Sequence, residues 1–288
     1  MQRILWSQFD MVHHIGEDMN MLTRGMMKLN NVISLSGGKD STAVLLLMLE
    51  NNEAVHSVVF FDTGWEFPAM YDHLDKLEKY TGVKIWRLRS RIPFDYLMTE
   101  RPVVAKNGEN KGKVHYVGYG WPSSMRRWCT REKVNALDSF SKPIPNRMTC
   151  IGYATDETKR IDMDECESHR FPLVEQGMTE ADALKYCYEH GFDWGGLYEH
   201  FNRVSCFCCP LTPLSSLRTL RKEFPDLWSR MLEMDSLIKR GPGMMMDSAP
   251  DHKFKGGRSV HDLDRRFYKE DASPLLDQEP YKTTHSET

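Results

Sequence analysis

Residues 31–50, NVISLSGGKDSTAVLLLMLE, place an apolar run, a pair of glycines and a longer apolar run in immediate succession. The first run, 31–36, has the length of a strand, and residues 41–50 have the length and composition of a helix. The turn that joins them is Ser36-Gly37-Gly38-Lys39-Asp40-Ser41-Thr42. Its glycines let the backbone turn tightly and approach a ligand, and a helix N-terminus attracts anions. We therefore predict that this turn binds phosphate.

The side chains of this phosphate loop suit the same chemistry. Ser36, Ser41 and Thr42 supply hydroxyl donors, and Lys39 neutralises phosphate charge. Asp40 either holds Mg²⁺ or caps the helix. The spacing differs from the Gly-x-x-x-x-Gly-Lys-Ser/Thr loop of P-loop NTPases, so this is another type of site. The alternative interpretation is an ordinary turn between a strand and a helix.

The alternation of strand and helix continues beyond the loop. We predict strands over 55–61, 84–88 and 147–151, a helix over 68–80, and a charged helix from about residue 155. Alternation of this kind indicates βαβ units and a parallel sheet. We expect an α/β fold, a three-layer sandwich on a mainly parallel sheet, with a helical, cysteine-rich C-terminal part.

This pattern divides the chain into four predicted parts. They are a helical arm (1–30), a nucleotide-binding α/β domain (31–165), a helical cysteine-rich metal-binding region (166–240) and a loose tail (241–288). Residues 101–127, which are rich in glycine, lysine and aromatic residues, are expected to form a long mobile loop over a site.

The composition excludes several classes of protein. The 288 residues are 40% hydrophobic and 27% charged, which is ordinary for a globular protein and rules out collagen, coiled coils and wholesale disorder. A net charge of −3 argues against a broad nucleic-acid-coating surface, although not against a local basic patch. The longest apolar run, 43–49, is far shorter than the roughly 18 residues of a membrane span. We expect no membrane association, no signal peptide and a cytoplasmic location.

Two further motifs lie at the ends of predicted strands: FDTGWEFP at 61–68 and IGYATDETKR at 151–160. The phosphate loop resembles the pyrophosphate loop of the N-type ATP pyrophosphatases, in the adenine nucleotide alpha-hydrolase-like superfamily. The other two motifs resemble those of the phosphoadenosine phosphosulfate (PAPS) reductase family. The resemblance covers residues 31 to about 240 and is closest to PAPS-reductase-like proteins carried by phages and mobile elements.

This resemblance implies a set of site residues and cofactors. The carboxyl ends of the strands at Ser36, Asp62 and Gly152 should converge on one crevice. The nucleotide, ATP or alternatively PAPS or adenylyl sulfate, would be bound with Mg²⁺ by Ser36, Gly37, Gly38, Lys39, Asp40, Ser41, Thr42, Asp62, Thr63 and Gly64. The catalytic residues would be Lys39, Asp40, Asp62, Lys159 and Arg160. For Lys159 and Arg160 a solvated helix face is the alternative.

Cysteines form a separate pattern. Cys206, Cys208 and Cys209 fall within four residues, and Cys129 lies earlier beside several arginines. Four thiolates suit a 4Fe–4S cluster or, alternatively, a tetrahedral Zn²⁺. The layout is similar to the iron–sulfur members of the family but departs from their two pairs, since one cysteine is distant and three are together. Buried apolar thiols are the alternative, and we expect that role for three others: Cys150, Cys166 and Cys187.

The function implied is an enzyme of sulfur metabolism, in which ATP-pyrophosphatase-type adenylation is coupled to sulfur transfer. One alternative is a strict PAPS or adenylyl-sulfate reductase. The lack of a cysteine after Cys209 argues against this alternative. A second is a non-catalytic nucleotide- and metal-binding module that acts through a partner. The implied partners are the nucleotide and a small-molecule sulfur donor, together with a protein partner or a nucleic-acid acceptor. Assembly into a homo-oligomer is left open.

Overall fold

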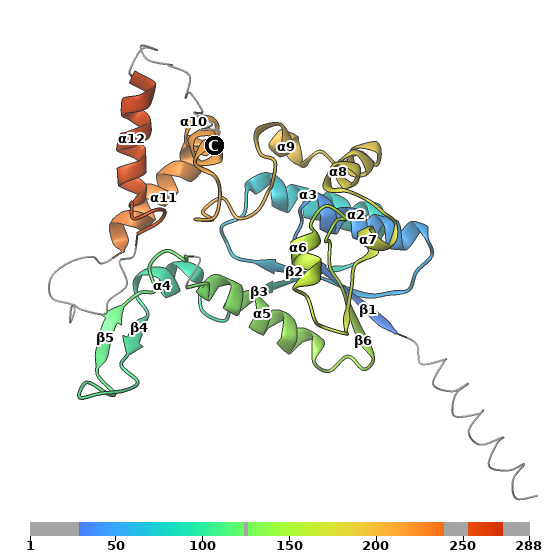
Figure 1. Ribbon diagram of the computed structural model, residues 1–288, viewed down its shortest axis with the longest axis horizontal. Helices are drawn as coiled ribbons and strands as arrows, with labels where there is room; N and C mark the ends of the chain where they lie inside the picture. The colour runs from blue at the N-terminus through green and yellow to red at the C-terminus, as the bar shows by residue number, and fades with distance from the viewer. Residues whose placement is uncertain (1–28, 124–125, 239–252, 273–288) are drawn as a thin grey trace, which may run out of the picture. The chain divides into compact units, whose positions relative to one another are not determined.

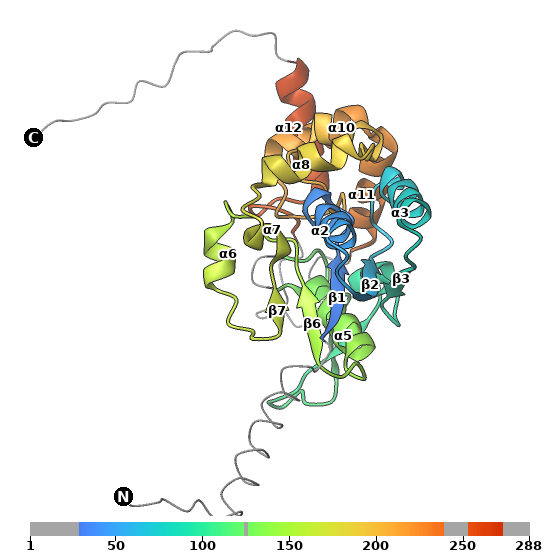
Figure 2. The same ribbon diagram turned by 90° about the vertical axis from the view of Figure 1, so that its right-hand side faces the viewer.

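The computed structural model describes residues 29–123, 126–238 and 253–272 of the chain. These fall into two compact units (Figures 1 and 2). The first contains residues 29–61, 69–88 and 134–195, and the second contains 62–68, 89–123, 126–133, 196–238 and 253–272. The units are therefore not the consecutive segments 31–165 and 166–240 that we predicted, because the chain passes between them several times and residues 166–195 belong to the first. The predicted arm lies almost wholly outside the described residues.

The first unit is built on a five-stranded sheet in the order β3-β2-β1-β6-β7. Its elements are β1 (Asn30–Leu35), α2 (Lys39–Glu50), β2 (Val55–Asp62), α3 (Pro68–Thr81), β3 (Ile85–Arg89), β6 (Arg147–Cys150), α6 (Thr158–Asp162), β7 (His169–Arg170), α7 (Pro172–Glu175) and α8 (Glu180–Glu189). The pairs β1–β2, β1–β6 and β6–β7 are parallel, which confirms the predicted fold class. The second half of α5 (Trp128–Ser141) also belongs to this unit.

Helices cover both faces of this sheet (Figure 1), with α2, α3, α7 and α8 on one side and the second half of α5 on the other. Residues 57–62 of β2 are all buried, as a strand covered on both faces requires. Helix α2 is buried nearly all round because it packs on β1 and also contacts α7 and α8. Its continuous apolar run, residues 43–49, of which 43–46 and Met48 are buried, follows from that position.

The order of the strands defines the edge where a ligand should bind. From β1 the chain crosses through α2 to β2 on one side, whereas β6 pairs with β1 on the other side. The point between β1 and β6 is therefore the topological switch point of the sheet. Ligands of open α/β sheets bind outside the carboxyl ends of strands at such a point. Here those ends are followed by the phosphate loop and by Gly152.

The second unit is mainly helical. Its elements are α4 (Phe94–Thr99), the antiparallel strands β4 (Pro102–Val104) and β5 (Val114–Val117), the first half of α5, α9 (Leu197–His200), α10 (Leu214–Glu223), α11 (Pro225–Leu237) and α12 (Val260–Ala272), and η1 (Trp194–Gly196) joins the units in sequence. Residues 101–127, which we predicted to form a long mobile loop, contain a hairpin formed by β4 and β5. The prediction of a loose tail was wrong at α12, where Val260, Leu263 and Phe267 are buried at helical spacing.

Among the described residues, no helix is both long enough and apolar enough to cross a membrane.

Candidate functional site

The phosphate loop leaves β1 and enters α2 in the first unit, as predicted. Gly37 has a φ of +80°, the left-handed region that favours glycine. Gly38 is the N-cap residue of α2, and no side chain caps this helix. The N–H groups of the first turn and the helix dipole therefore face a position that an anion can occupy.

Hydroxyl groups hold the loop in this shape. The Ser41 hydroxyl accepts the N–H of Ser36 at 3.0 Å and donates to the carbonyl oxygen of Gly38 at 3.1 Å. It also contacts the Ser36 hydroxyl at 3.0 Å. Ser41 is almost fully buried, so in this arrangement its hydroxyl shapes the backbone.

A buried aromatic group that was not predicted from the sequence braces the loop. The indole N–H of Trp194 donates to the carbonyl oxygen of Gly37 at 2.7 Å. The imidazole of His73 stacks on Trp194 with ring centroids 4.5 Å apart, and its Nε2 lies 3.0 Å from the Thr42 hydroxyl. Burial lowers the pKa of His73 to about 3, so the ring is neutral. The hydroxyl of Thr42, predicted to contact phosphate, is paired with this ring.

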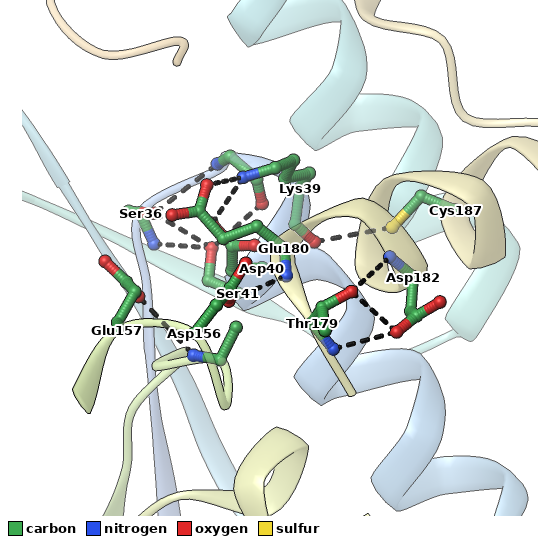
Figure 3. A network of polar contacts seen from close by, with 12 residues as sticks. Ser36, Lys39, Asp40, Ser41, Asp156, Glu157, Thr179, Glu180, Asp182 and Cys187 are labelled. Carbon is green, nitrogen blue, oxygen red and sulfur yellow. Dashed lines mark hydrogen bonds and ion pairs between the residues drawn. The ribbon is translucent and has the colours of Figure 1, made fainter. Parts of the chain in front are cut away.

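Acidic groups surround Lys39 (Figure 3). The ammonium group of Lys39 is buried and contacts Asp40 Oδ2 at 3.1 Å and Glu180 Oε2 at 2.5 Å. Asp40 Oδ1 is buried without a hydrogen-bond partner in the described structure. Burial raises the pKa of Asp40 to about 6; Lys39 opposes this rise, whereas Glu180 and Glu157 add to it. An orphaned carboxylate oxygen beside this loop is a suitable ligand for a hard cation such as Mg²⁺.

Helix α8 positions Glu180, another residue that was not predicted from the sequence. Thr179 and Asp182 form a capping box at its N-terminus, and the N–H of Glu180 donates to Asp156 Oδ1 at 3.1 Å. On the inner face of α8, the buried thiol of Cys187 contacts the carbonyl oxygen of Lys39 at 3.4 Å (Figure 3). Burial raises the pKa of Cys187 to about 12, so this thiol packs as a neutral group, as we expected.

The motif after β6 meets the phosphate loop in the first unit. A Cβ atom on Gly152 would lie 2.8 Å from the backbone of Asp40 and Ser41, so only glycine allows this approach. Glu157 of the same motif ion-pairs with Arg160, whose guanidinium lies 4.3 Å over the ring of Tyr153. Arg160 and Lys159 are exposed on α6, which fits either of the two roles considered for them.

The second motif forms a turn in the second unit. Asp62, the last residue of β2, accepts the N–H of Gly64 at 2.8 Å and pairs with Arg89, whose Nε lies 2.8 Å away. The Thr63 hydroxyl donates to Glu66 Oε1 at 2.8 Å. The guanidinium of Arg230 lies 4.0 Å over the ring of Trp65 and donates to the carbonyl oxygen of Gly64 at 3.0 Å. The Asp62 carboxylate is thus fixed by a backbone N–H and a cation.

The four predicted metal ligands all belong to the second unit. The pKa of the Cys206 thiol is raised by its hydrogen bond with Cys208 and by burial. The pKa of the Cys209 thiol is raised by its hydrogen bond with Cys206 and by burial. Burial raises the pKa of Cys129, and nearby Cys209 adds to the rise. As the side chains lie, the described residues contain no group of three or more His, Cys, Asp or Glu that could hold a metal ion. Cys206 lies in hydrogen-bond contact with Cys208 and Cys209, and the raised pKa values keep the thiols of Cys129, Cys206 and Cys209 neutral. The donor set itself is one that zinc and iron–sulfur clusters use.

Of the other cysteines, Cys150 is buried in β6, as predicted, whereas Cys166 is exposed. The prediction for Cys166 was wrong because the segment after α6 leaves it at the surface, where its thiol lies 3.2 Å from the Ser168 hydroxyl.

A sequence model of the phosphoadenosine phosphosulfate reductase domain matches residues 30–212. The uncharacterized protein MJ0066 of Methanocaldococcus jannaschii is 26% identical over 217 residues, which cover 69% of this chain and 40% of that protein. A 37.8 kDa protein of Escherichia phage 186 is 32% identical over 114 residues, 40% of this chain and 29% of that protein. The chain thus spans less than half the length of these curated relatives.

Two solved structures are similar at low identity. The PAPS reductase from Candida auris, in a phosphate complex, has a TM-score of 0.45 and 14% identity, and the match covers 71% of this chain and 98% of that chain. The U34-tRNA thiolase NcsA from Methanococcus maripaludis, with its 4Fe–4S cluster, has a TM-score of 0.38 and 15% identity, covering 84% of this chain and 72% of that chain. The family match over 30–212 includes every residue predicted for the site.

Proposed function

Because the chain belongs to the phosphoadenosine phosphosulfate reductase family, we propose that its first unit binds the phosphates of an adenine nucleotide. The observation that carries this proposal is the geometry of the phosphate loop. A left-handed glycine, an uncapped helix N-terminus and a buried lysine meet at the carboxyl end of β1. Backbone N–H groups, a helix dipole and a cation are the three elements of a phosphate site.

Binding would exchange one anion for another at Lys39. In the structure its ammonium group is neutralised by Asp40 and Glu180. An incoming phosphate would displace the carboxylate of Glu180, which is 40% exposed, so the lysine keeps a negative partner throughout. Asp40, whose Oδ1 lacks a hydrogen-bond partner, would hold the Mg²⁺ that accompanies the nucleotide.

We propose ATP as the nucleotide and adenylation as its chemistry. An oxygen of the acceptor attacks the α-phosphorus of ATP, the bond to the β-phosphate oxygen breaks, and pyrophosphate leaves. A sulfide-level donor then attacks the adenylated carbon, and AMP leaves with the oxygen. The loop N–H groups, Lys39 and the exposed cations of α6 would stabilise the charge on the phosphates, so catalysis would be mainly positioning and electrostatic stabilisation.

We also propose that Cys129, Cys206, Cys208 and Cys209 hold a 4Fe–4S cluster, with Zn²⁺ as the alternative. The support is the donor set: four thiols of one unit, three of them within four residues. Such a cluster supplies a site that binds sulfur or transfers electrons. The chain's own contribution is to provide the thiols. Those whose pKa is raised, Cys129, Cys206 and Cys209, are neutral without metal and would release their protons when the metal binds.

The family description favours a second candidate, reduction of a sulfonucleotide. Product analysis separates the two. Purified protein would be incubated without oxygen with ATP, Mg²⁺ and sulfide, and separately with PAPS and a dithiol. Adenylation predicts pyrophosphate and AMP once the acceptor is present, whereas reduction predicts sulfite. Lys39→Met should abolish the active reaction, and Lys142→Met, on an exposed lysine of the same unit, should not. Sulfite released from PAPS by the wild-type protein and not by Lys39→Met would overturn the adenylation proposal.

A further inference from the structure

Positive charge in this chain is concentrated between residues 101 and 131. This segment has seven Lys and Arg and one acidic residue, Glu109, whereas the whole chain has 38 Lys and Arg against 41 Asp and Glu. It contains the β4–β5 hairpin and the first turn of α5, all in the second unit (Figure 1). A local excess of this size in an acidic chain is the electrostatic footprint of a surface for a polyanion.

These cations are not used inside the structure. Among the described residues, no ion pair involves Lys106, Lys111, Lys113, Arg126, Arg127 or Arg131. Other arginines of the same unit are paired: Arg221 with Asp264 and Arg218 with Asp271. Five of the six unpaired cations are exposed, and Arg126 is half-buried. Within the part of the chain that the structure describes, this segment therefore presents positive charge that no carboxylate pairs with.

Backbone and aromatic contacts fix where these cations lie. Lys106, Lys111 and Lys113 are at the hairpin tip, where the N–H of Ala105 donates to the carbonyl oxygen of Lys113 at 3.0 Å. Arg101 is at the base, with its guanidinium 5.4 Å over the ring of Tyr119. At roughly 3.3 Å per strand residue, base and tip are about 16 Å apart, which is the span of several phosphates of one nucleic-acid strand.

The same base is joined to the start of α5. The ring of Tyr119 lies 5.8 Å from that of Trp128, whose indole N–H donates to the carbonyl oxygen of Gly120 at 3.1 Å. Trp128 is the first residue of α5 and follows Arg126 and Arg127 directly. The cations of the hairpin and of α5 therefore belong to one continuous part of the second unit.

We propose that the β4–β5 hairpin and the first turn of α5 bind the phosphate backbone of a nucleic acid. The partly exposed rings of His115 and Tyr116 on β5 add surfaces on which bases stack. Cys129 lies between Arg127 and Arg131, so the bound strand would lie beside a predicted sulfur-handling thiol. The acceptor would then be a nucleic acid. That last assignment rests on the proposed function, whereas the binding itself does not.

The test is fluorescence anisotropy of a labelled single-stranded oligonucleotide, titrated with the full-length protein at several salt concentrations and without ATP. The variant replaces Lys106, Lys111 and Lys113 by glutamine. The control replaces three exposed lysines elsewhere, Lys79, Lys185 and Lys222, and so loses the same charge. For the hairpin variant we expect weaker binding and a slope of log K against log salt smaller by roughly two, at about 0.7 per phosphate contact. The control should match the wild type.

The proposal would be overturned if the wild-type protein did not bind the oligonucleotide at about 50 mM salt, or if the hairpin variant and the control variant lost affinity equally. It would also be overturned if the protein bound polyglutamate as tightly as the oligonucleotide, which would indicate an acidic protein partner. Arg127→Gln/Arg131→Gln, which leaves the hairpin intact, provides a second variant if the first fails to fold, and it too should weaken binding. Lys39→Met should still bind the oligonucleotide, so that failure of the nucleotide site and failure of this surface are distinguished.

Discussion

The indole N–H of Trp194 donates a 2.7 Å hydrogen bond to the carbonyl oxygen of Gly37, a residue 157 positions earlier in the chain. Gly37 is the residue whose left-handed backbone turns the phosphate loop. Since His73 stacks on the same indole and reaches Thr42, one aromatic pair contacts both ends of the loop. The shape of the loop therefore depends on a side chain that lies outside its own motif.

Replacing Trp194 by phenylalanine should destabilise the protein and weaken nucleotide binding together. The variant keeps a ring for His73 but leaves the buried carbonyl of Gly37 without its donor, which costs about 1–3 kcal/mol. Urea unfolding measures the first effect and titration calorimetry the second. Trp86→Phe, at a ring that is 44% exposed, is the matched control and should change neither. Wild-type stability in Trp194→Phe would show that this hydrogen bond is dispensable.

Glu180→Gln should increase the affinity for ATP. It removes the carboxylate that competes with phosphate for Lys39, while Asp40 continues to pair with the lysine. An increase of about tenfold corresponds to about 1.4 kcal/mol. Glu189→Gln, an exposed position on the same helix, controls for the loss of one charge. Weaker ATP binding in Glu180→Gln would mean that this carboxylate serves the bound nucleotide and does not compete with it.

Stability should fall as the pH rises from about 4 to about 6, in part because of Asp40. Its pKa is about 6 in the folded protein against 3.8 as the ordinary value, so in this range the folded state keeps a proton that the unfolded state has lost. The penalty above pH 6 is at most about 3 kcal/mol. Asp40→Asn has no such group, so its stability relative to the wild type should increase across this range.

Urea unfolding of both proteins at several pH values measures this difference. Glu180 provides a second check because it helps to raise the pKa of Asp40. In Glu180→Gln the fall in stability should therefore occur at lower pH. A constant difference between Asp40→Asn and the wild type from pH 4 to pH 7 would contradict the assignment.

The sequence was sufficient for those parts of the fold that local pattern determines. The strand at 31–36, the glycine turn and the following helix were predicted because apolar runs and turn residues are adjacent in the chain, although α2 begins at Lys39, two residues earlier than expected. The parallel sheet followed from the alternation of such units. The hairpin was missed because its strands are only three and four residues long and are separated by a Gly- and Lys-rich tip.

The residues missed at the site share a different cause. Glu180 and Trp194 reach the loop from 141 and 157 residues away, and neither lies in a recognisable motif. One sequence signal was present, the Thr179 and Asp182 capping box, which predicts that a helix starts beside Glu180. It could not indicate that this helix packs on α2, because that contact depends on tertiary structure.

The thiols should take up metal when the protein is prepared without oxygen. We expect broad absorbance near roughly 400 nm and about four irons per chain, both lost in Cys206→Ser. Cys206 is chosen because its thiol interacts with both Cys208 and Cys209. Cys166→Ser, at an exposed thiol of the first unit, should keep the metal. One colourless zinc per chain would contradict the iron–sulfur assignment and leave the cysteines a structural role.

Binding of an adenine nucleotide by the phosphate loop is measured by titration calorimetry of ATP with Mg²⁺ into the wild-type protein and into Lys39→Met. We expect one site per chain in the wild type, with affinity reduced at least about tenfold in the variant, since a buried cation that would contact phosphate is lost. Equal affinity in the two proteins, or no binding in either, would contradict it.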